Sequence, residues 1–355
     1  MLGVFRGDGI GPELVDGCIS LLEILGTRGG RRFDLRFGGE IGDESSKRWG
    51  KPLTEEAVAF ADGIFKEGGA LFCGAGGGRF VYEMRARFDL FCKMNPIHGY
   101  PELSGTGRVR ALEGDPIDLL VVRENLGGLY HPEEETGAGD AGEKRVKTSF
   151  FTSEAQVREL LRVACLAATA RQGRLCIVVK RAGIPAASRL WMNVAEEEAA
   201  IQGIDLEVQD IDYAAYRIVQ DPRRFDVLAT PNCFGDIMAD LGGLLCGSRG
   251  MTFGSSHSHN GAAVYQTNHG AAHDLVGKGE ANPAGQIFSL ALMLADHYGM
   301  EAEGRALVDA VREVWRAGWR TPDIFEPGCR ALSTAEMFAE VGRQLSGLKF
   351  PTSDH

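Results

Sequence analysis

Apolar and polar positions along the chain follow two alternating patterns. Short apolar runs of strand length alternate with longer segments in which apolar residues recur every three or four positions. This order predicts an α/β protein, in which helices pack on a mostly parallel sheet. The strands are expected at residues 70–73, 117–122, 175–179 and 225–230, and the helices at residues 13–25, 154–171, 283–298 and 301–319.

Three segments of the chain read as loops. Residues 132–143 are rich in acidic residues, glycine and alanine and cannot bury much apolar surface, so we expect a solvated loop or a protruding arm. The glycine groups at residues 7–11 and 74–78 lack the spacing of a Rossmann fingerprint and the Lys-Ser/Thr pair of a Walker loop. Taken alone, they predict turns.

Composition narrows the classes of function. With 355 residues, of which 44% are hydrophobic, the chain can form two ordinary domains or one deeply cleft unit. The net charge of −11 is spread along the chain, which argues against a nucleic-acid partner. We find no signal peptide and no apolar stretch of membrane-spanning length, and therefore expect a cytoplasmic protein without membrane contact. Eight widely spaced cysteines without a C-x-x-C pair favour reduced packing residues.

Two carboxylates suggest a metal site. Asp236 and Asp240 lie four residues apart, just after an apolar run that breaks at Pro231 and Gly235. A helix there stacks both carboxylates on one face, with about 5 to 6 Å between their Cβ atoms. That geometry suits Mg²⁺ or Mn²⁺, which prefer oxygen ligands. The alternative is an acidic first turn that complements the helix dipole.

Several arginines suggest anion binding. Arg85, Arg87 and Arg123 follow glycine turns or short apolar runs, where ligand-facing groups often lie. Guanidinium groups bind carboxylates through paired hydrogen bonds. The alternative for each is a surface ion pair with Glu83 or Glu124.

A loop rich in glycine and alanine, residues 269–283, suggests a site for a flat ligand. Its small residues let such a ligand approach the backbone, and Asp274 can accept hydrogen bonds from a sugar diol. The alternative is a plain surface loop that Asn282 caps before the helix at Pro283.

Taken in order, these motifs resemble a known family. They include GDGIGPE at 7–13, FDLF at 88–91, VVREN at 121–125, NCFGD at 232–236 and HGAAHD at 269–274. The order is similar to that of the metal-dependent β-decarboxylating dehydrogenases, which include isocitrate, isopropylmalate, homoisocitrate and tartrate dehydrogenases. The resemblance implies hydride transfer from a metal-chelated hydroxy acid to NAD, followed by loss of CO₂ from the β-keto acid.

The resemblance also implies roles for individual residues. Asp212, Asp236 and Asp240 become the carboxylates that bind Mg²⁺ or Mn²⁺, and Asp212 reaches the site across the interface of a homodimer. Arg85 and Arg123 become carboxylate-binding residues. Tyr130 becomes a proton donor near the reacting carbon.

The implied fold is isopropylmalate-dehydrogenase-like, with two α/β domains, a mostly parallel central sheet and a cleft between the domains. The cofactor-binding domain comprises residues 1–92 and 251–355, and the dimerisation and metal/substrate domain comprises residues 93–250. The residues implied for NAD binding are His269, Gly270, Asp274 and Asn282. A carboxylate at Asp274 accepts both ribose hydroxyls and repels a 2′-phosphate, which favours NAD over NADP.

The sequence departs from the family pattern at two places. Asn95 stands where relatives have a further arginine, so the expected substrate is a 3-substituted malate other than isopropylmalate or isocitrate. Arg181 stands where relatives have a catalytic lysine, and Gly183 where they have an asparagine. Motif alignment predicts that Arg181 faces the site and Lys180 does not, whereas a local bulge would bring Lys180 in instead.

Further alternatives concern Arg79 and the activity itself. Arg79 lies where relatives contact the variable part of the substrate, so a base there suits an anionic group; the alternative is a solvated arginine at a helix start. An active dehydrogenase is the favoured function because most of the implied site residues are present. The alternatives are a non-catalytic regulatory subunit and a dehydrogenase that does not decarboxylate.

Overall fold

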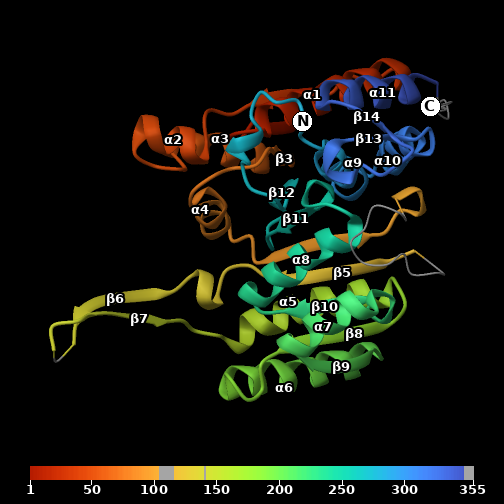
Figure 1. Cartoon of the computed structure of the whole chain (residues 1–355). Helices are drawn as coiled ribbons and strands as arrows, with labels where there is room; N and C mark the ends of the chain where they lie inside the picture. Colours follow the sequence, from red (N-terminus) through yellow and green to blue (C-terminus); the bar gives the residue numbers. More distant parts are fainter. Residues whose placement is uncertain (104–115, 140, 348–355) are drawn as a thin grey trace.

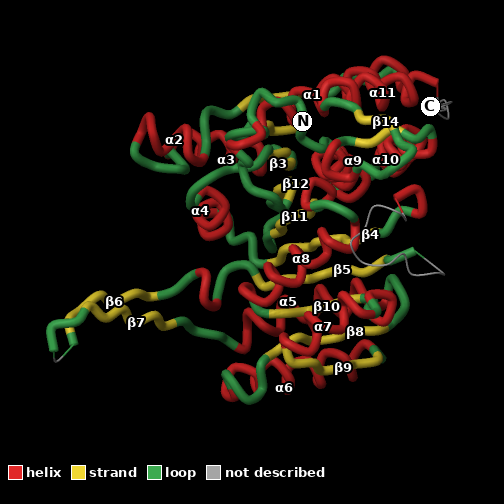
Figure 2. The backbone as a smooth tube through the Cα atoms, viewed as in Figure 1, coloured by secondary structure: helices red, strands yellow, loops and turns green. Residues whose placement is uncertain are grey.

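A ten-stranded mixed sheet runs through the middle of the molecule (Figures 1 and 2). The computed structural model describes residues 1–103, 116–139 and 141–347. The strand order is β2-β1-β3-β12-β11-β4-β5-β10-β8-β9; β11 pairs antiparallel with β12 and β4, β4 pairs antiparallel with β5, and the other pairs are parallel. The strands are β1 (Leu2–Phe5), β2 (Leu35–Phe37), β3 (Ala70–Cys73), β4 (Cys92–His98), β5 (Asp118–Glu124), β8 (Arg174–Val179), β9 (Asp205–Asp210), β10 (Val227–Thr230), β11 (Phe253–His257) and β12 (Ala263–Thr267).

Helices cover both faces of this sheet. The helices are α1 (Gly11–Gly29), α2 (Gly42–Trp49), α3 (Glu55–Lys66), α4 (Phe80–Arg87), α5 (Glu154–Thr169), α6 (Pro185–Gln202), α7 (Ile211–Gln220), α8 (Asn232–Cys246), α9 (Ala284–Asp296), α10 (Glu301–Arg316) and α11 (Thr334–Gly347). One layer contains α1, α7, α8, α9, α10 and α11, and the other contains α3, α4, α5 and α6.

Burial on both faces explains why the central strands read as unbroken apolar runs. In β3, Ala70 and Phe72 face the layer of α1 and α9, whereas Leu71 and Cys73 face α3 and α4. Alternate side chains of a strand point to opposite faces, so a strand covered on both sides needs apolar residues throughout. The four predicted strands correspond to β3, β5, β8 and β10, and the four predicted helices to α1, α5, α9 and α10. The α/β fold class is therefore confirmed.

An exposed two-stranded arm extends from the sheet half that carries β5 and β8 (Figure 1). It consists of β6 (Glu133–Ala138) and β7 (Lys144–Ser149), which pair antiparallel. The sequence predicts a solvated loop or an arm at residues 132–143, and the structure shows an arm. Its strands could not be read from the sequence because neither side of the hairpin is buried by the described part of this chain, so no apolar alternation marks them.

The two halves of the sheet come from different parts of the chain. Strands β1, β2, β3, β11 and β12 belong to residues 1–92 and 251–355, and β5, β8, β9 and β10 belong to residues 93–250. The predicted boundary between residues 92 and 93 falls at the start of β4, which joins the halves by pairing with both β5 and β11. Within the described ranges, we find no helix that is long and apolar enough to cross a membrane. All eight cysteines are free, as expected for packing residues.

Candidate active site

The candidate site forms where the end of β5 meets the start of α8. Arg123, in β5, donates from Nε and Nη2 to Oδ1 of Asn232 at 2.9 and 2.7 Å, and its Nη1 pairs with Asp236. The Tyr130 hydroxyl donates to Oδ2 of Asp236 at 3.0 Å. A Cβ atom at Gly235 would lie 2.7 Å from Cγ of Arg123, so the glycine makes room for the buried arginine. Arg123 thus pairs with Asp236 rather than with Glu124, which was the alternative.

Two carboxylates of α8 have the predicted helical spacing. Asp236 and Asp240 are one turn apart, and both side chains are about half exposed. The helix begins at Asn232 and carries no acidic residue in its first turn, so the dipole alternative does not apply to this pair. Burial alone would raise the pKa of Asp236, but the charges of Arg123 and Lys93 lower it below its usual value. Two carboxylates with this spacing fit Mg²⁺ or Mn²⁺, which prefer oxygen ligands.

The third predicted metal carboxylate, Asp212, lies on α7 and does not join the other two. Its Oδ1 accepts a hydrogen bond from Nζ of Lys180 at 2.6 Å. Among the described residues of the single chain, no three His, Cys, Asp or Glu side chains gather into a metal site. A site completed by a second copy of the chain, as the resemblance implies, stays a prediction.

Lys180 and Arg181 contact different carboxylates in the single chain. Lys180 contacts Asp212, whereas Arg181 turns to Asp210, whose Oδ1 accepts from its backbone N–H at 2.9 Å and from its Nε at 3.1 Å. A Cβ atom at Gly183 would lie 2.9 Å from Cγ of Lys180, so the glycine leaves space for the path of the lysine. Lys180 thus contacts Asp212, one of the three predicted metal carboxylates, whereas Arg181 contacts none of them within the described residues. Which of the two faces the completed site and acts in catalysis stays a prediction.

A second arginine approaches the site from α4. Arg85 is buried, its Nη1 has no hydrogen-bond partner among the described residues, and its guanidinium carbon lies 5.4 Å from the ring centre of Tyr82. Burial, with the charge of Arg123 added, lowers the pKa of Arg85 to about 9. Arg87 is exposed, and Arg79 is the exposed residue that precedes α4, with its guanidinium 5.2 Å from the same ring. Arg79 therefore lies at the start of a helix, a position that both interpretations of this residue share.

Lys93 belongs to this cluster, and the sequence analysis missed it. It lies in β4 directly opposite Arg123 of β5 and is only 5% exposed. Burial lowers the pKa of Lys93 well below its usual value, and the charges of Arg85 and Arg123 lower it further. The sequence does hold a signal for Lys93. It lies two residues before Asn95, a predicted substrate-binding residue, and therefore shares a face of the strand with it.

Asn95 is held by the protein itself. Its Nδ2 donates to Oδ1 of Asn268 at 2.8 Å and lies 3.4 Å from the carbonyl oxygen of Phe253. Its Oδ1 is buried and has no partner among the described residues. Contact between Asn95 and a substrate stays a prediction, and only its oxygen is free for that contact.

The predicted cofactor loop packs on the two glycine turns. The backbone N–H of Ile10 donates to the carbonyl of Ala271 at 2.9 Å, and Gly9, at φ +57°, leaves no room for a Cβ atom beside that carbonyl. The carboxylate of Asp8 accepts from the backbone N–H groups of Asp43 and Gly77 at 2.7 and 2.8 Å. These contacts hold both glycine turns and the loop together, an arrangement that spacing alone did not predict.

Within that loop, the four predicted cofactor residues differ in their exposure and in the hydrogen bonds that they already form. Gly270 and Asp274 are exposed. His269 has a buried, unpartnered Nε2, and burial lowers the pKa of its ring. The side chain of Asn282 is fully engaged, because its Oδ1 accepts from the N–H of Ala284 at 2.9 Å and its Nδ2 donates to Asp323 at 3.0 Å. The capping alternative for Asn282 is therefore observed, while NAD binding stays a prediction.

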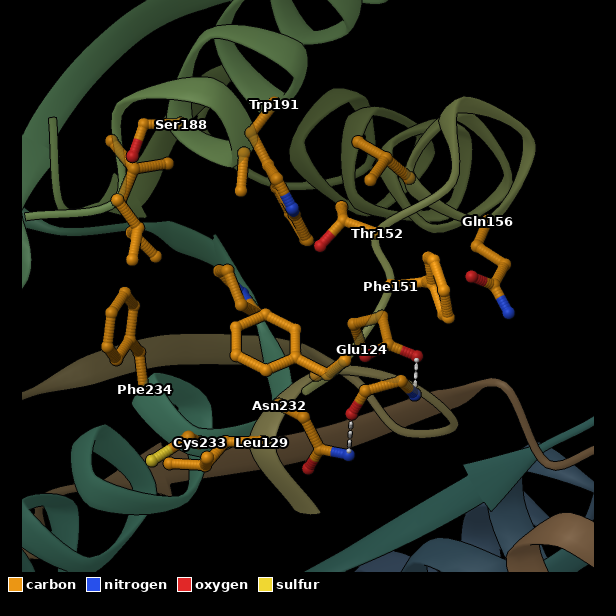
Figure 3. A pocket seen from close by; sticks show the side chains of 18 residues that line it. Glu124, Leu129, Phe151, Thr152, Gln156, Ser188, Trp191, Asn232, Cys233 and Phe234 are labelled. Carbon is orange, nitrogen blue, oxygen red and sulfur yellow. Dashed lines mark hydrogen bonds between the residues drawn. The ribbon is translucent and has the colours of Figure 1, made fainter. Parts of the chain in front are cut away.

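An apolar cavity of about 190 Å³ lies next to the charged cluster (Figure 3). Phe151, Trp191 and Phe234 line it, and it is not the place where the charged side chains meet. Asn232 borders both regions, because its Nδ2 donates to the carbonyl of Gly127 at 3.1 Å while its Oδ1 accepts from Arg123. The sequence did not predict this cavity.

Comparisons with known proteins agree with this architecture. The chain matches the isocitrate/isopropylmalate dehydrogenase family over residues 1–341. It is 32% identical to 3-isopropylmalate dehydrogenase of Geobacillus kaustophilus over 96% of this chain and 94% of that protein, and 36% identical to the Oleidesulfovibrio alaskensis protein of the same name over 92% and 94%. The crystal structure of isocitrate dehydrogenase from Methylococcus capsulatus superposes with a TM-score of 0.85 at 28% identity, covering 97% of this chain and 99% of that one. The chain therefore belongs to the isocitrate/isopropylmalate dehydrogenase family and is one of its dehydrogenases.

Proposed function

We propose that the protein oxidises a 3-substituted malate-type 2-hydroxy acid with NAD in the presence of Mg²⁺ or Mn²⁺, and that loss of CO₂ follows. The observation that supports this most directly is the convergence of Arg85, Arg123 and Tyr130 around Asp236. Buried guanidinium groups favour a carboxylate ligand, and the adjacent carboxylate suits a divalent cation. A bound cation would stabilise negative charge on the substrate oxygens, and NAD would accept the hydride.

Residues of the chain would bind the substrate and donate a proton to it. Arg85 and Arg123 would bind and orient the substrate carboxylates. Burial and the charge of Asp236 raise the pKa of the Tyr130 hydroxyl, so it is protonated at neutral pH and can donate a proton to the reacting carbon. Arg79, exposed just before α4, would meet an anionic group on the substituent.

A homodimer would complete the metal site. Large apolar side chains are exposed on α7 and α8, among them Tyr213, Tyr216, Ile237 and Leu244. Neighbouring exposed apolar residues on the same two helices are typical of an interface. A second copy packed there would bring its Asp212 toward Asp236 and Asp240, as the resemblance implies.

The cofactor would lie in the loop after β12. Exposed Gly270 and Asp274 leave the backbone and a carboxylate available to a nucleotide, and the close packing of this loop on Gly9 holds its conformation. A carboxylate at position 274 favours the free ribose hydroxyls of NAD over the phosphate of NADP.

The proposal is tested with purified protein, Mg²⁺, NAD and a panel of 3-substituted malates that includes isopropylmalate and isocitrate. We expect NADH absorbance to rise with at least one other panel member more strongly than with these two. Release of CO₂ in step with NADH would support decarboxylation, whereas NADH without CO₂ would favour the dehydrogenase that stops at the keto acid. Absence of any turnover, together with retained ligand binding, would favour the regulatory-subunit alternative.

A further inference from the structure

Lys93 is a buried basic residue beside the candidate site, near the charges of Asp236 and Asp240 but bonded to neither. No hydrogen bond or ion pair joins its side chain to another residue in the described ranges, although it is only 5% exposed. Burial disfavours a charged ammonium group and lowers the pKa of Lys93, so a bound anion would stabilise its charged form. A lysine in this position therefore calls for a partner that comes from outside the chain.

The surroundings of Lys93 strengthen this requirement. Arg85 is also buried, with an unpartnered Nη1, and Arg123 stands directly opposite Lys93 across the β4–β5 pair. Asp236 is the acidic side chain bonded to this group, and it pairs with Arg123. Three basic groups facing one bonded carboxylate favour an anionic ligand, whose charge would also stabilise the protonated form of Lys93.

The nearby carboxylates do not remove this surplus. Glu124 follows Arg123 in β5 and thus points to the other face, where its Oε1 accepts from the N–H groups of Leu126 and Gly127 at 2.6 and 2.8 Å. Asp240 pairs with Arg249, whose Nη2 is 3.0 Å from its Oδ2. Neither carboxylate forms an ion pair with Lys93 or Arg85 in the described structure.

We propose that Lys93 is a substrate-binding residue, which together with Arg85 binds a carboxylate of the hydroxy acid. It takes the place of the arginine that relatives have at the position of Asn95, two residues further along the same face of β4. Asn95 cannot serve as the donor, because its Nδ2 is bonded to Asn268. This inference rests on the proposed function of the site.

A lysine has consequences for specificity that differ from those of an arginine. Its ammonium is a compact point charge without the planar fork that aligns a carboxylate through two parallel hydrogen bonds. The carboxylate bound here would be selected by charge more than by orientation. The matching ligand class is a hydroxy acid with at least two carboxylates, one of which lies between Lys93 and Arg85.

Calorimetric binding of D-malate in the presence of Mg²⁺ tests the inference without requiring turnover. We expect Lys93→Met to weaken malate binding at least about tenfold, whereas Lys93→Arg, which keeps the charge, retains binding within about threefold. The matched control is Lys66→Met, which removes an exposed lysine of α3 and should leave binding unchanged. For active enzyme, the Michaelis constant for the hydroxy acid should rise in Lys93→Met while that for NAD stays constant.

Thermal melting separates substrate binding from a structural role. Removal of an unpaired buried charge should leave the melting temperature of Lys93→Met unchanged or higher, whereas a structural lysine would leave it lower; Lys93→Gln replaces it if the methionine variant does not fold. Malate binding by Lys93→Met equal to that of the unmodified protein would overturn the inference and leave the proposed function intact. Failure of the unmodified protein to bind malate would also overturn the inference, whereas the proposed function is tested separately by turnover of the 3-substituted malates.

Discussion

At the scale of single residues, Asp236 is the point on which the candidate site depends. It receives the guanidinium of Arg123 and the hydroxyl of Tyr130, and Asp240 lies one helical turn beyond it. The half-exposed side chains leave oxygen lone pairs that these partners do not use. Both carboxylates are therefore available to a divalent cation beside an anionic substrate.

We predict that Asp236→Asn and Asp240→Asn each lower kcat/KM by more than about 100-fold, because each removes a charge from the proposed cation site. The measurement is the rate of NADH formation as a function of Mg²⁺ concentration. Asp62→Asn, which changes an exposed carboxylate of α3, is the control. Unchanged metal affinity in both site variants would contradict the metal assignment.

Lys180 and Arg181 are the two candidates for the catalytic position that relatives fill with a lysine. Alignment predicts that loss of Arg181 abolishes activity, but it is Lys180 that contacts Asp212, at 2.6 Å. We now predict that Lys180→Ala lowers kcat by about 100-fold or more, since a lysine can relay protons, whereas Arg181→Ala keeps most activity. Comparison of kcat for the two variants decides between the assignments. An inactive Arg181→Ala variant together with an active Lys180→Ala variant would instead support the assignment of Arg181 from motif alignment.

At the scale of elements, the loop between β12 and α9 is the proposed cofactor-binding segment. Its start is held against Gly9, and its end is tied to Asp323 through Asn282, while the part around Asp274 stays exposed. Only the exposed part can therefore contact the ribose of a dinucleotide without rearranging the loop.

We predict that the protein prefers NAD over NADP and that Asp274→Lys weakens or reverses this preference by about tenfold or more, because it replaces a charge that repels a 2′-phosphate by one that attracts it. The measurement is kcat/KM for each cofactor with the same hydroxy acid. Glu280→Lys, a charge change at another position of the same loop, serves as the control. Equal values for both cofactors in the unmodified protein would count against the role of Asp274.

At the scale of the whole molecule, the proposed site is incomplete in one chain. Asp212 lies on α7 and pairs with Lys180, away from Asp236 and Asp240, and the exposed apolar residues of α7 and α8 mark the surface through which a second copy would bring its own Asp212. Activity should then depend on assembly as well as on folding.

Subunit mixing tests this arrangement. Asp212→Asn and Asp236→Asn should each be inactive alone, but a hybrid dimer contains one site in which both residues are intact. After joint unfolding and refolding, random pairing should restore about a quarter of the unmodified activity, because half of the dimers are hybrids with one active site of two. If mixing restores nothing although hybrids form, Asp212 does not act across the interface.

The sequence by itself determined the fold class, four strands and four helices, and the helical spacing of Asp236 and Asp240. Buried strands such as β3 need apolar residues on both faces, and the four-residue spacing of Asp236 and Asp240 has one meaning on a helix. Such features are local, so periodicity and spacing are sufficient to predict them.

Only the tertiary structure decided which side chains meet. Lys93 enters the site because β4 pairs with β5 in a register that places it opposite Arg123, and Lys180 reaches Asp212 because Gly183 leaves space beside it. The pairing of β6 with β7 likewise follows no apolar pattern in the described arm. Strand register, the space around a side chain and strand pairing depend on contacts between separate segments of the chain. The local pattern of apolar and polar residues therefore cannot predict them.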